Sequence, residues 1–145
     1  MSSIGALRRP PGSGYYSASK SALEAMTGSL RKEGEPLGLK VIAVEPGGFR
    51  TDFSGRSLMQ SATAIDDYAE TAGQRRKEND TVHGTQPGDP ARAAQAIIEV
   101  VASPRPPSLL VLGRDALATA TAVLDAQRAE MEEWRELSTR TGFED

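Results

Sequence analysis

The sequence predicts an α/β fold in which helices flank part of a parallel sheet. Two short apolar runs, at residues 41–44 and 108–112, are rich in branched side chains and bounded by turn residues, as is typical of buried strands. A segment with helical spacing of apolar residues precedes each run, and another follows the second. This order predicts αβ units in a parallel sheet, but two strands alone leave edges and faces that such a sheet normally covers.

Composition limits the class of protein. With 145 residues, 38% hydrophobic and 26% charged, the chain is expected to form one soluble globular domain over residues 1–145. A net charge of -3 gives no reason to expect nucleic-acid binding, and no stretch approaches the ~20 apolar residues of a membrane span. The absence of cysteine excludes disulfides and thiolate metal sites and fits a cytoplasmic location. The single histidine, His83, is expected to be a solvated side chain, so no metal site is predicted.

The first half of the chain is expected to contain a loop, a long helix and a strand. Two prolines and two glycines predict a loop over residues 6–14. A helix is then predicted from about Tyr15 to Glu33, ended by the turn residues of 34–38, and the strand follows over 41–44. The small residues of one helix face are Ala18, Ala22, Ala25 and Ser29, and the larger apolar residues of another are Leu23, Met26 and Leu30.

The second half begins with a segment, 47–88, that shows little sustained periodicity. It is predicted to be a lid or insertion with, at most, short helices of its own. Asp89 and Pro90 supply the cap and first-turn proline of a helix that is expected to end before the prolines of 104–107. A second buried strand is predicted over 108–112, followed by a last helix from about Asp115. The apolar stripe of that helix is Leu117, Ala120, Leu124, Met131 and Trp134.

One pair of side chains on the first long helix suggests proton chemistry. Tyr16 and Lys20 are four residues apart and therefore project from the same helix face. A cation one helical turn away favours the ionised form of a phenol, which makes a tyrosine a usable general acid/base near neutral pH. Tyr15 has Ser19 in the corresponding place and lacks that activation. The alternative is an ordinary amphipathic helix with a surface lysine, because this spacing also arises by chance.

Two neighbouring features favour the chemical interpretation. Ser3 precedes Tyr16 across a loop rich in glycine and proline, which allows the chain to double back. Pro46 and Gly47 follow the first strand, and the hydroxyl of Thr51 comes just beyond them. In open α/β sheets, ligands bind outside the carboxyl ends of the strands. These residues are therefore expected to gather at one ligand site.

Taken together, the motifs resemble the short-chain dehydrogenase/reductase family, whose members are nicotinamide-dependent oxidoreductases on a Rossmann fold. The motifs Ser-Ser-x-Gly-Ala, Tyr-Ser-Ala-Ser-Lys and Pro-Gly-x-x-x-Thr-Asp-Phe appear in the family's order. The resemblance extends over essentially the whole chain. Its closing part, with the sequence Leu-Leu-Val-Leu-Gly-Arg-Asp-Ala, is similar to the hydroxysteroid-dehydrogenase-like branch.

The resemblance implies a role for each matching residue. Tyr16 would exchange a proton with the substrate oxygen, and Lys20 would favour its phenolate and bond the ribose beside the nicotinamide. Ser3 would hydrogen-bond the substrate oxygen, whereas Ser2 would be structural. Phe49 stands where the family often has an aliphatic residue, which puts that contact in doubt. The implied catalytic residues are Ser3, Tyr16 and Lys20, and the implied cofactor-binding residues are Tyr16, Lys20, Pro46, Gly47, Phe49 and Thr51.

Other parts of the family pattern have no counterpart in these 145 residues. The Gly-rich dinucleotide turn, the Asn-Asn-Ala-Gly strand end and the residue that selects NAD or NADP are missing. The resemblance implies that they would precede residue 1. The expected fold is therefore the carboxyl-terminal half of a doubly wound Rossmann-type sheet, with segment 47–88 as a substrate lid. The cofactor is NAD or NADP, and the sequence does not distinguish them.

Two functions of different classes remain open. The first is an oxidoreductase that transfers hydride between the cofactor and a secondary alcohol or ketone. The second is a truncated, inactive fragment that acts at most as an oligomerisation or interaction module. The family commonly forms subunit interfaces from the helices that correspond to 15–33 and 90–103, which implies a homo-oligomer. An in-frame Gly-rich segment in the DNA upstream of Met1 would favour the enzyme, and a stop codon would favour the fragment.

Overall fold

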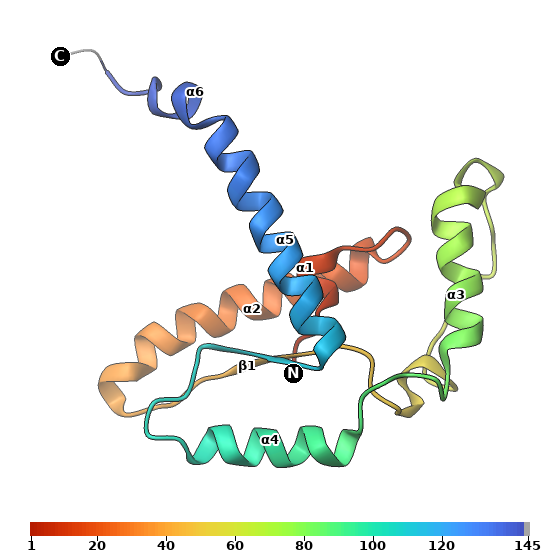
Figure 1. Ribbon diagram of the computed structural model, residues 1–145, viewed down its shortest axis with the longest axis horizontal. Helices are drawn as coiled ribbons and strands as arrows, with labels where there is room; N and C mark the ends of the chain where they lie inside the picture. The colour runs from red at the N-terminus through yellow and green to blue at the C-terminus, as the bar shows by residue number, and fades with distance from the viewer. Residues whose placement is uncertain (144–145) are drawn as a thin grey trace.

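A parallel pair of strands organises the fold of the computed structural model, which describes residues 1–143 (Figure 1). Strand β1 (Ala43–Pro46) pairs with β2 (Leu109–Leu112), so that Ala43 lies opposite Leu109 and Pro46 opposite Leu112. The helix α4 (Pro90–Ala102) and the segment before it connect the two strands. The predicted α/β class with a parallel sheet is confirmed.

The amino-terminal residues extend this sheet along the other edge of β1. The Ser2 N–H donates to the Val44 carbonyl at 2.7 Å, and the Ile4 N–H donates to the Pro46 carbonyl at 3.2 Å. A step of two residues along the amino-terminal segment matches a step of two residues in the same direction along β1, so the two segments run parallel. Strand β1 is thus hydrogen-bonded on both edges, and Ser3 lies near its carboxyl end.

A short helix, α1 (Gly5–Arg8), follows directly, so the predicted loop over 6–14 is wrong for residues 6–8. The Ser3 Oγ accepts from the Gly5 N–H at 3.1 Å and satisfies the first turn of α1. Arg9, with a φ of 49°, ends it in the left-handed conformation. The prolines that suggested a loop lie at 10 and 11, after the helix, where they do not interfere with its backbone bonds.

The long helices lie close to their predicted positions. Helix α2 (Gly14–Gly34) was expected over 15–33 and is followed by the turn η1 (Glu35–Leu37). The Asp89 Oδ1 accepts from the Ala91 N–H at 2.8 Å and caps α4, as its sequence predicts. Helix α5 (Arg114–Glu133) is followed by α6 (Arg135–Thr139), and Figure 1 shows this arm extending away from the rest of the chain.

The strands differ more from their predictions. Strand β1 begins two residues later than the apolar run at 41–44 and includes Glu45, because its limits are set by the pairing with β2 rather than by side-chain polarity. The prediction of a second buried strand is wrong in part. Leu109 of β2 is 40% exposed and the other three residues are half-buried, because β2 is at the edge of the sheet.

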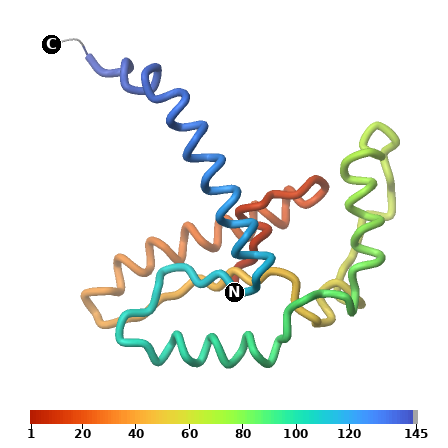
Figure 2. The backbone as a smooth tube through the Cα atoms, in the orientation of Figure 1, coloured from red at the N-terminus to blue at the C-terminus, as the bar shows by residue number. Residues whose placement is uncertain are grey.

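The segment between β1 and α4 holds more helix than expected. It contains η2 (Asp52–Ser54), η3 (Asp66–Tyr68), η4 (Ala69–Gly73) and α3 (Gln74–Val82). The tube in Figure 2 shows α3 and the loop before it standing apart from the strand pair. Many of its hydrogen bonds are local, such as that from Arg75 to Glu78, which explains why a largely polar segment is helical.

The core of residues 1–143 is built from small side chains. Helix α1 packs against α5, and the contact uses alanines that let the two backbones approach closely. The predicted stripe along α5 is buried only at Ala120, and its larger residues stay exposed. The buried apolar residues are Ala6, Ala43, Val44, Ala116 and Ala120. Within the described residues, no helix combines the length and apolar character that a membrane crossing requires.

Candidate active site

Tyr16 and Lys20 lie one turn apart near the start of α2. The Lys20 Nζ is 5.8 Å from the centre of the Tyr16 ring and donates a hydrogen bond to the Met1 carbonyl at 3.2 Å. Tyr16 is half-buried, whereas the neighbouring Tyr15 is 98% exposed. Of the two tyrosines, only Tyr16 therefore has a cation beside its ring and a partly enclosed environment.

Ser3 is brought to the same place by the close approach of the chain around Gly5. A Cβ added to Gly5 would lie 3.0 Å from the Tyr16 Cε1 and 3.3 Å from the Ser3 Oγ. The absence of a side chain at Gly5 thus leaves room for the serine hydroxyl and the tyrosine ring on the same side of α1. The structure brings together the three predicted catalytic residues, Ser3, Tyr16 and Lys20.

Ser2 and the carboxyl groups of Glu24 and Glu45 form a polar cluster in which Ser2 and Glu45 are buried and Glu24 is half-buried. The Ser2 Oγ donates to the Glu24 Oε1 and makes a longer contact, of 3.4 Å, with the Lys20 carbonyl. Ser2 is buried, which agrees with the structural role that the resemblance implies. Burial raises the pKa of Glu45 to about 7, and the hydrogen bond and charge repulsion from the carboxyl of Glu24 add to this increase.

The loop after β1 carries the remaining predicted residues. Pro46 ends the strand, and the Gly47 N–H donates to the Leu112 carbonyl of β2 at 2.8 Å. The Thr51 Oγ1 accepts from the Phe53 N–H at 3.3 Å and caps η2. Thr51 is exposed, so its O–H is free to point to solvent or to a ligand. These residues leave the sheet at the carboxyl end of β1, where the sequence predicts a ligand site.

Phe49 is half-buried and lies against Gly88, with which its backbone forms an isolated bridge. A Cβ on Gly88 would be 2.5 Å from the Phe49 ring, so the aromatic side chain fills space that only a glycine opposite leaves free. The ring therefore packs within the protein. Its contact with a cofactor stays a prediction.

Two residues near the site had no predicted role. The ring of Phe53 lies 5.9 Å from the ring of Tyr16, centre to centre, at an angle of 49°. The Asp115 Oδ2 accepts from the Gly48 N–H at 2.8 Å. Phe53 belongs to the Thr-Asp-Phe motif and Asp115 to the Gly-Arg-Asp-Ala sequence, so both lie in stretches that the resemblance includes. Their contacts depend on the tertiary fold, which spacing along the chain does not reveal.

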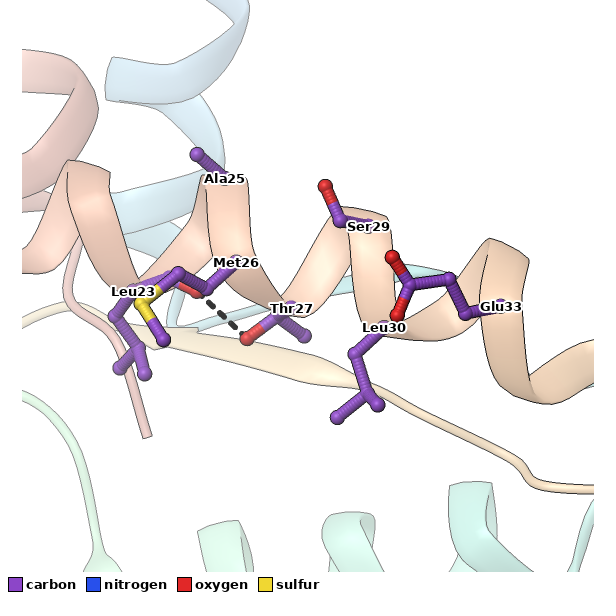
Figure 3. A pocket seen from close by; sticks show the side chains of 7 residues that line it. All are labelled: Leu23, Ala25, Met26, Thr27, Ser29, Leu30 and Glu33. Carbon is purple, nitrogen blue, oxygen red and sulfur yellow. Dashed lines mark hydrogen bonds between the residues drawn. The ribbon is translucent and has the colours of Figure 1, made fainter.

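A shallow groove elsewhere on α2 is separate from these groups. Its lining comes from α2 alone, and Figure 3 shows Leu23, Met26 and Leu30 along it, with the Thr27 hydroxyl donating to the Leu23 carbonyl at 2.7 Å. All three apolar side chains are exposed. None of the predicted catalytic residues lines this groove.

Comparisons with known proteins agree with this geometry. The family model described as short chain dehydrogenase matches residues 1–61, which include the serine pair, Tyr16, Lys20 and the loop after β1. A solved short-chain dehydrogenase from Streptomyces avermitilis superposes with a TM-score of 0.85 and is 40% identical, over 98% of this chain and 51% of that protein. The chain belongs to the short-chain dehydrogenase/reductase family.

Curated relatives of this short-chain dehydrogenase/reductase chain are described as oxidoreductases or reductases. An oxidoreductase of Botryotinia fuckeliana is 33% identical over 95% of this chain and 50% of the relative. A 3-ketodihydrosphingosine reductase of Bacteroides thetaiotaomicron is 34% identical over 74% of this chain and 40% of the relative. The chain thus spans about half the length, or less, of the relatives it matches here. Neither description names a hydroxysteroid dehydrogenase, so that branch stays a prediction.

Proposed function

We propose that these residues carry the proton-transfer side of an NAD(P)-dependent oxidoreductase that interconverts a secondary alcohol and a ketone. The observation that carries the proposal is the meeting of Ser3 and Tyr16 around Gly5, near the carboxyl end of β1, with the Lys20 ammonium over the Tyr16 ring. A hydroxyl donor, a phenol and a cation are the groups that stabilise and protonate a carbonyl oxygen as it gains negative charge.

The residues present fit the nicotinamide end of such a cofactor. An ammonium group has three donors, and the Lys20 Nζ has one hydrogen bond, to the Met1 carbonyl, within residues 1–143. Two donors are left, which suits a ribose diol. Pro46, Gly47 and Thr51 would lie against the nicotinamide and its carboxamide. When bound, the cofactor supplies or accepts the hydride.

The side chains of this chain would handle the proton. In the reducing direction, the Ser3 Oγ–H donates a hydrogen bond to the carbonyl oxygen and orients it, and the Tyr16 Oη–H transfers its proton to the same oxygen. The ammonium of Lys20 stabilises the phenolate that remains. In the oxidising direction the phenolate takes the proton back from the alcohol. Phe53 packs beside the Tyr16 ring and supports its position.

The first experiment joins residues 1–145 to the amino-terminal half of the Streptomyces avermitilis short-chain dehydrogenase, here called the completed enzyme. NADH or NADPH oxidation is followed with a panel of ketones, and residues 1–145 alone are expected to be inactive. Lys20→Ala should lower kcat and raise the KM for the cofactor, each by at least about tenfold, because one ammonium serves both phenol and ribose.

Lys32→Ala, at an exposed position on α2, is the matched control and should change neither constant. Wild-type kinetics in the Lys20→Ala enzyme would contradict the proposed roles. Turnover by the isolated chain would show that the added amino-terminal half is dispensable. A cytoplasmic location for the protein stays a prediction.

We also propose a homo-oligomer formed through α2 and α4, which the exposed apolar residues Met26, Leu30 and Ile98 support. A subunit interface of this kind is compatible with an active oxidoreductase. An inactive interaction module would form the same interface. Met26→Glu should shift the sedimentation coefficient of the purified chain to that of a monomer, because it places a charge in the groove of Figure 3. The control Met59→Glu changes an exposed residue outside the groove. A monomeric wild type would exclude the oligomer.

A further inference from the structure

The carboxylate of Asp115 fills a space that two glycines leave open. A Cβ on Gly47 would lie 2.5 Å from the Asp115 Oδ2, and a Cβ on Gly113 would lie 2.6 Å from its Oδ1. Gly113 has a φ of 106°, a conformation that other residues rarely adopt. The side chain of Asp115 thus sits directly against the backbone of the loop that follows β1.

This contact is also a specific hydrogen bond. The Asp115 Oδ2 accepts from the Gly48 N–H at 2.8 Å, across 67 residues of sequence. Asp115 lies in the first turn of α5, where the helix dipole favours a negative charge. The carboxylate therefore gains from both the backbone donor and the helix terminus, and it joins the start of α5 to the end of β1.

The loop is held on its other side by Gly88, the last residue of the 47–88 segment. The Gly88 N–H donates to the Gly48 carbonyl at 2.9 Å, and the Arg50 N–H donates to the Gly88 carbonyl at 3.0 Å. The N–H of Gly48 is thus bonded to Asp115, and its carbonyl is bonded to Gly88. The backbone between Pro46 and Arg50 has little freedom to move as long as both contacts persist.

We infer that Asp115 is a positioning residue that holds the loop 46–51 in the conformation that receives the nicotinamide. The inference rests on the proposed function, because this loop is where the nicotinamide end of the cofactor would lie. Asp115 itself touches the loop from the side of α5 and acts through Gly47 and Gly48. It is not expected to take part in proton transfer.

The first test measures the loop directly in residues 1–145. Hydrogen exchange of the Gly48 amide, followed by NMR, should be at least about tenfold faster in Asp115→Ala than in the wild type, because its acceptor is gone. Asp115→Asn keeps an acceptor oxygen and should retain most of the protection. Asp125→Ala, at an exposed position on the same helix, is the control and should leave Gly48 unchanged. Unaltered Gly48 exchange in Asp115→Ala would overturn the inference.

The second test measures cofactor use in the completed enzyme. Asp115→Ala should lower kcat/KM for NADH or NADPH by about ten- to a hundredfold, with most of the change in KM, and Asp115→Asn should recover most of it. An equal loss in both variants, or a loss confined to kcat, would refute a positioning role. If the completed enzyme shows no nicotinamide-dependent turnover at all, the proposed function fails and the cofactor part of this inference with it. The hydrogen-exchange experiment tests the contact between Asp115 and Gly48 independently of the proposed function.

Discussion

Tyr16→Phe in the completed enzyme is expected to reduce kcat by roughly 10³-fold, within the range attributed to general acid–base catalysis. The phenylalanine keeps the ring that packs at 5.9 Å from Phe53 and lies beneath the Lys20 ammonium, so the local structure should be preserved. The substitution removes only the hydroxyl, to which we assign the proton exchange. Steady-state rates with a ketone substrate measure the effect, and the dissociation constant of NADH or NADPH should change by less than about threefold.

Tyr15→Phe provides a control that differs by a single position. Tyr15 precedes Tyr16 on α2 but is 98% exposed and has no cation beside it in the structure, so its replacement should leave kcat unchanged. A Tyr16→Phe enzyme that retained near wild-type turnover would refute the assigned mechanism. Equal losses in both variants would instead indicate a change in the stability of the helix.

Glu45→Gln is expected to stabilise the folded chain at pH 8 by about 3 kcal/mol and to flatten the pH dependence of its stability. The Glu45 side chain is 1% exposed and its Oε2 has no hydrogen-bond partner among the described residues. An ionised carboxylate there is costly, because burial and the nearby carboxyl of Glu24 both disfavour it. Glutamine removes the charge and can donate a hydrogen bond to Glu24.

The sign of the pH dependence follows from the direction of the shift. Burial raises the pKa of Glu45 from 4.5 to about 7, so the folded state binds a proton that the unfolded state has already released between these values. The contribution to stability is fully present below pH 4.5 and is lost as the pH rises through about 7. Urea unfolding at pH 5 to 8 measures it, with Glu33→Gln, exposed on α2, as the control. A slope that persists in Glu45→Gln would assign the dependence to other groups.

Local signals located the long helices well and the strands less well. The Asp89–Pro90 cap and the turn after Gly34 are chemical signals within a few residues of the boundary they mark. A strand boundary depends on the partner strand, and β1 includes Glu45 because Leu112 and the residues before it define the register. A charged residue inside a buried strand contradicts the apolar pattern on which the prediction of 41–44 relied.

The candidate site shows the same division. Tyr16 and Lys20 share a helix turn, so their proximity could be predicted from spacing alone. Ser3 was placed by the resemblance, and the structure adds the reason, which is the room left by Gly5. The contact between Asp115 and Gly48 could not be predicted in this way, because it requires the position of α5 relative to the end of β1. The cofactor-binding roles of Pro46, Gly47, Phe49 and Thr51 stay predictions.

The position of Trp134 has a practical consequence for fluorescence spectroscopy. It is the single tryptophan of the chain, lies between α5 and α6, and is 54% exposed. Figure 1 shows α5 leading away from the strand pair. Its emission in the isolated chain should be red-shifted already, and unfolding of the sheet should alter it little. A blue shift would instead report that another surface has covered the end of α5. This intrinsic probe is therefore suited to detecting association along the arm, and unfolding must be followed by circular dichroism.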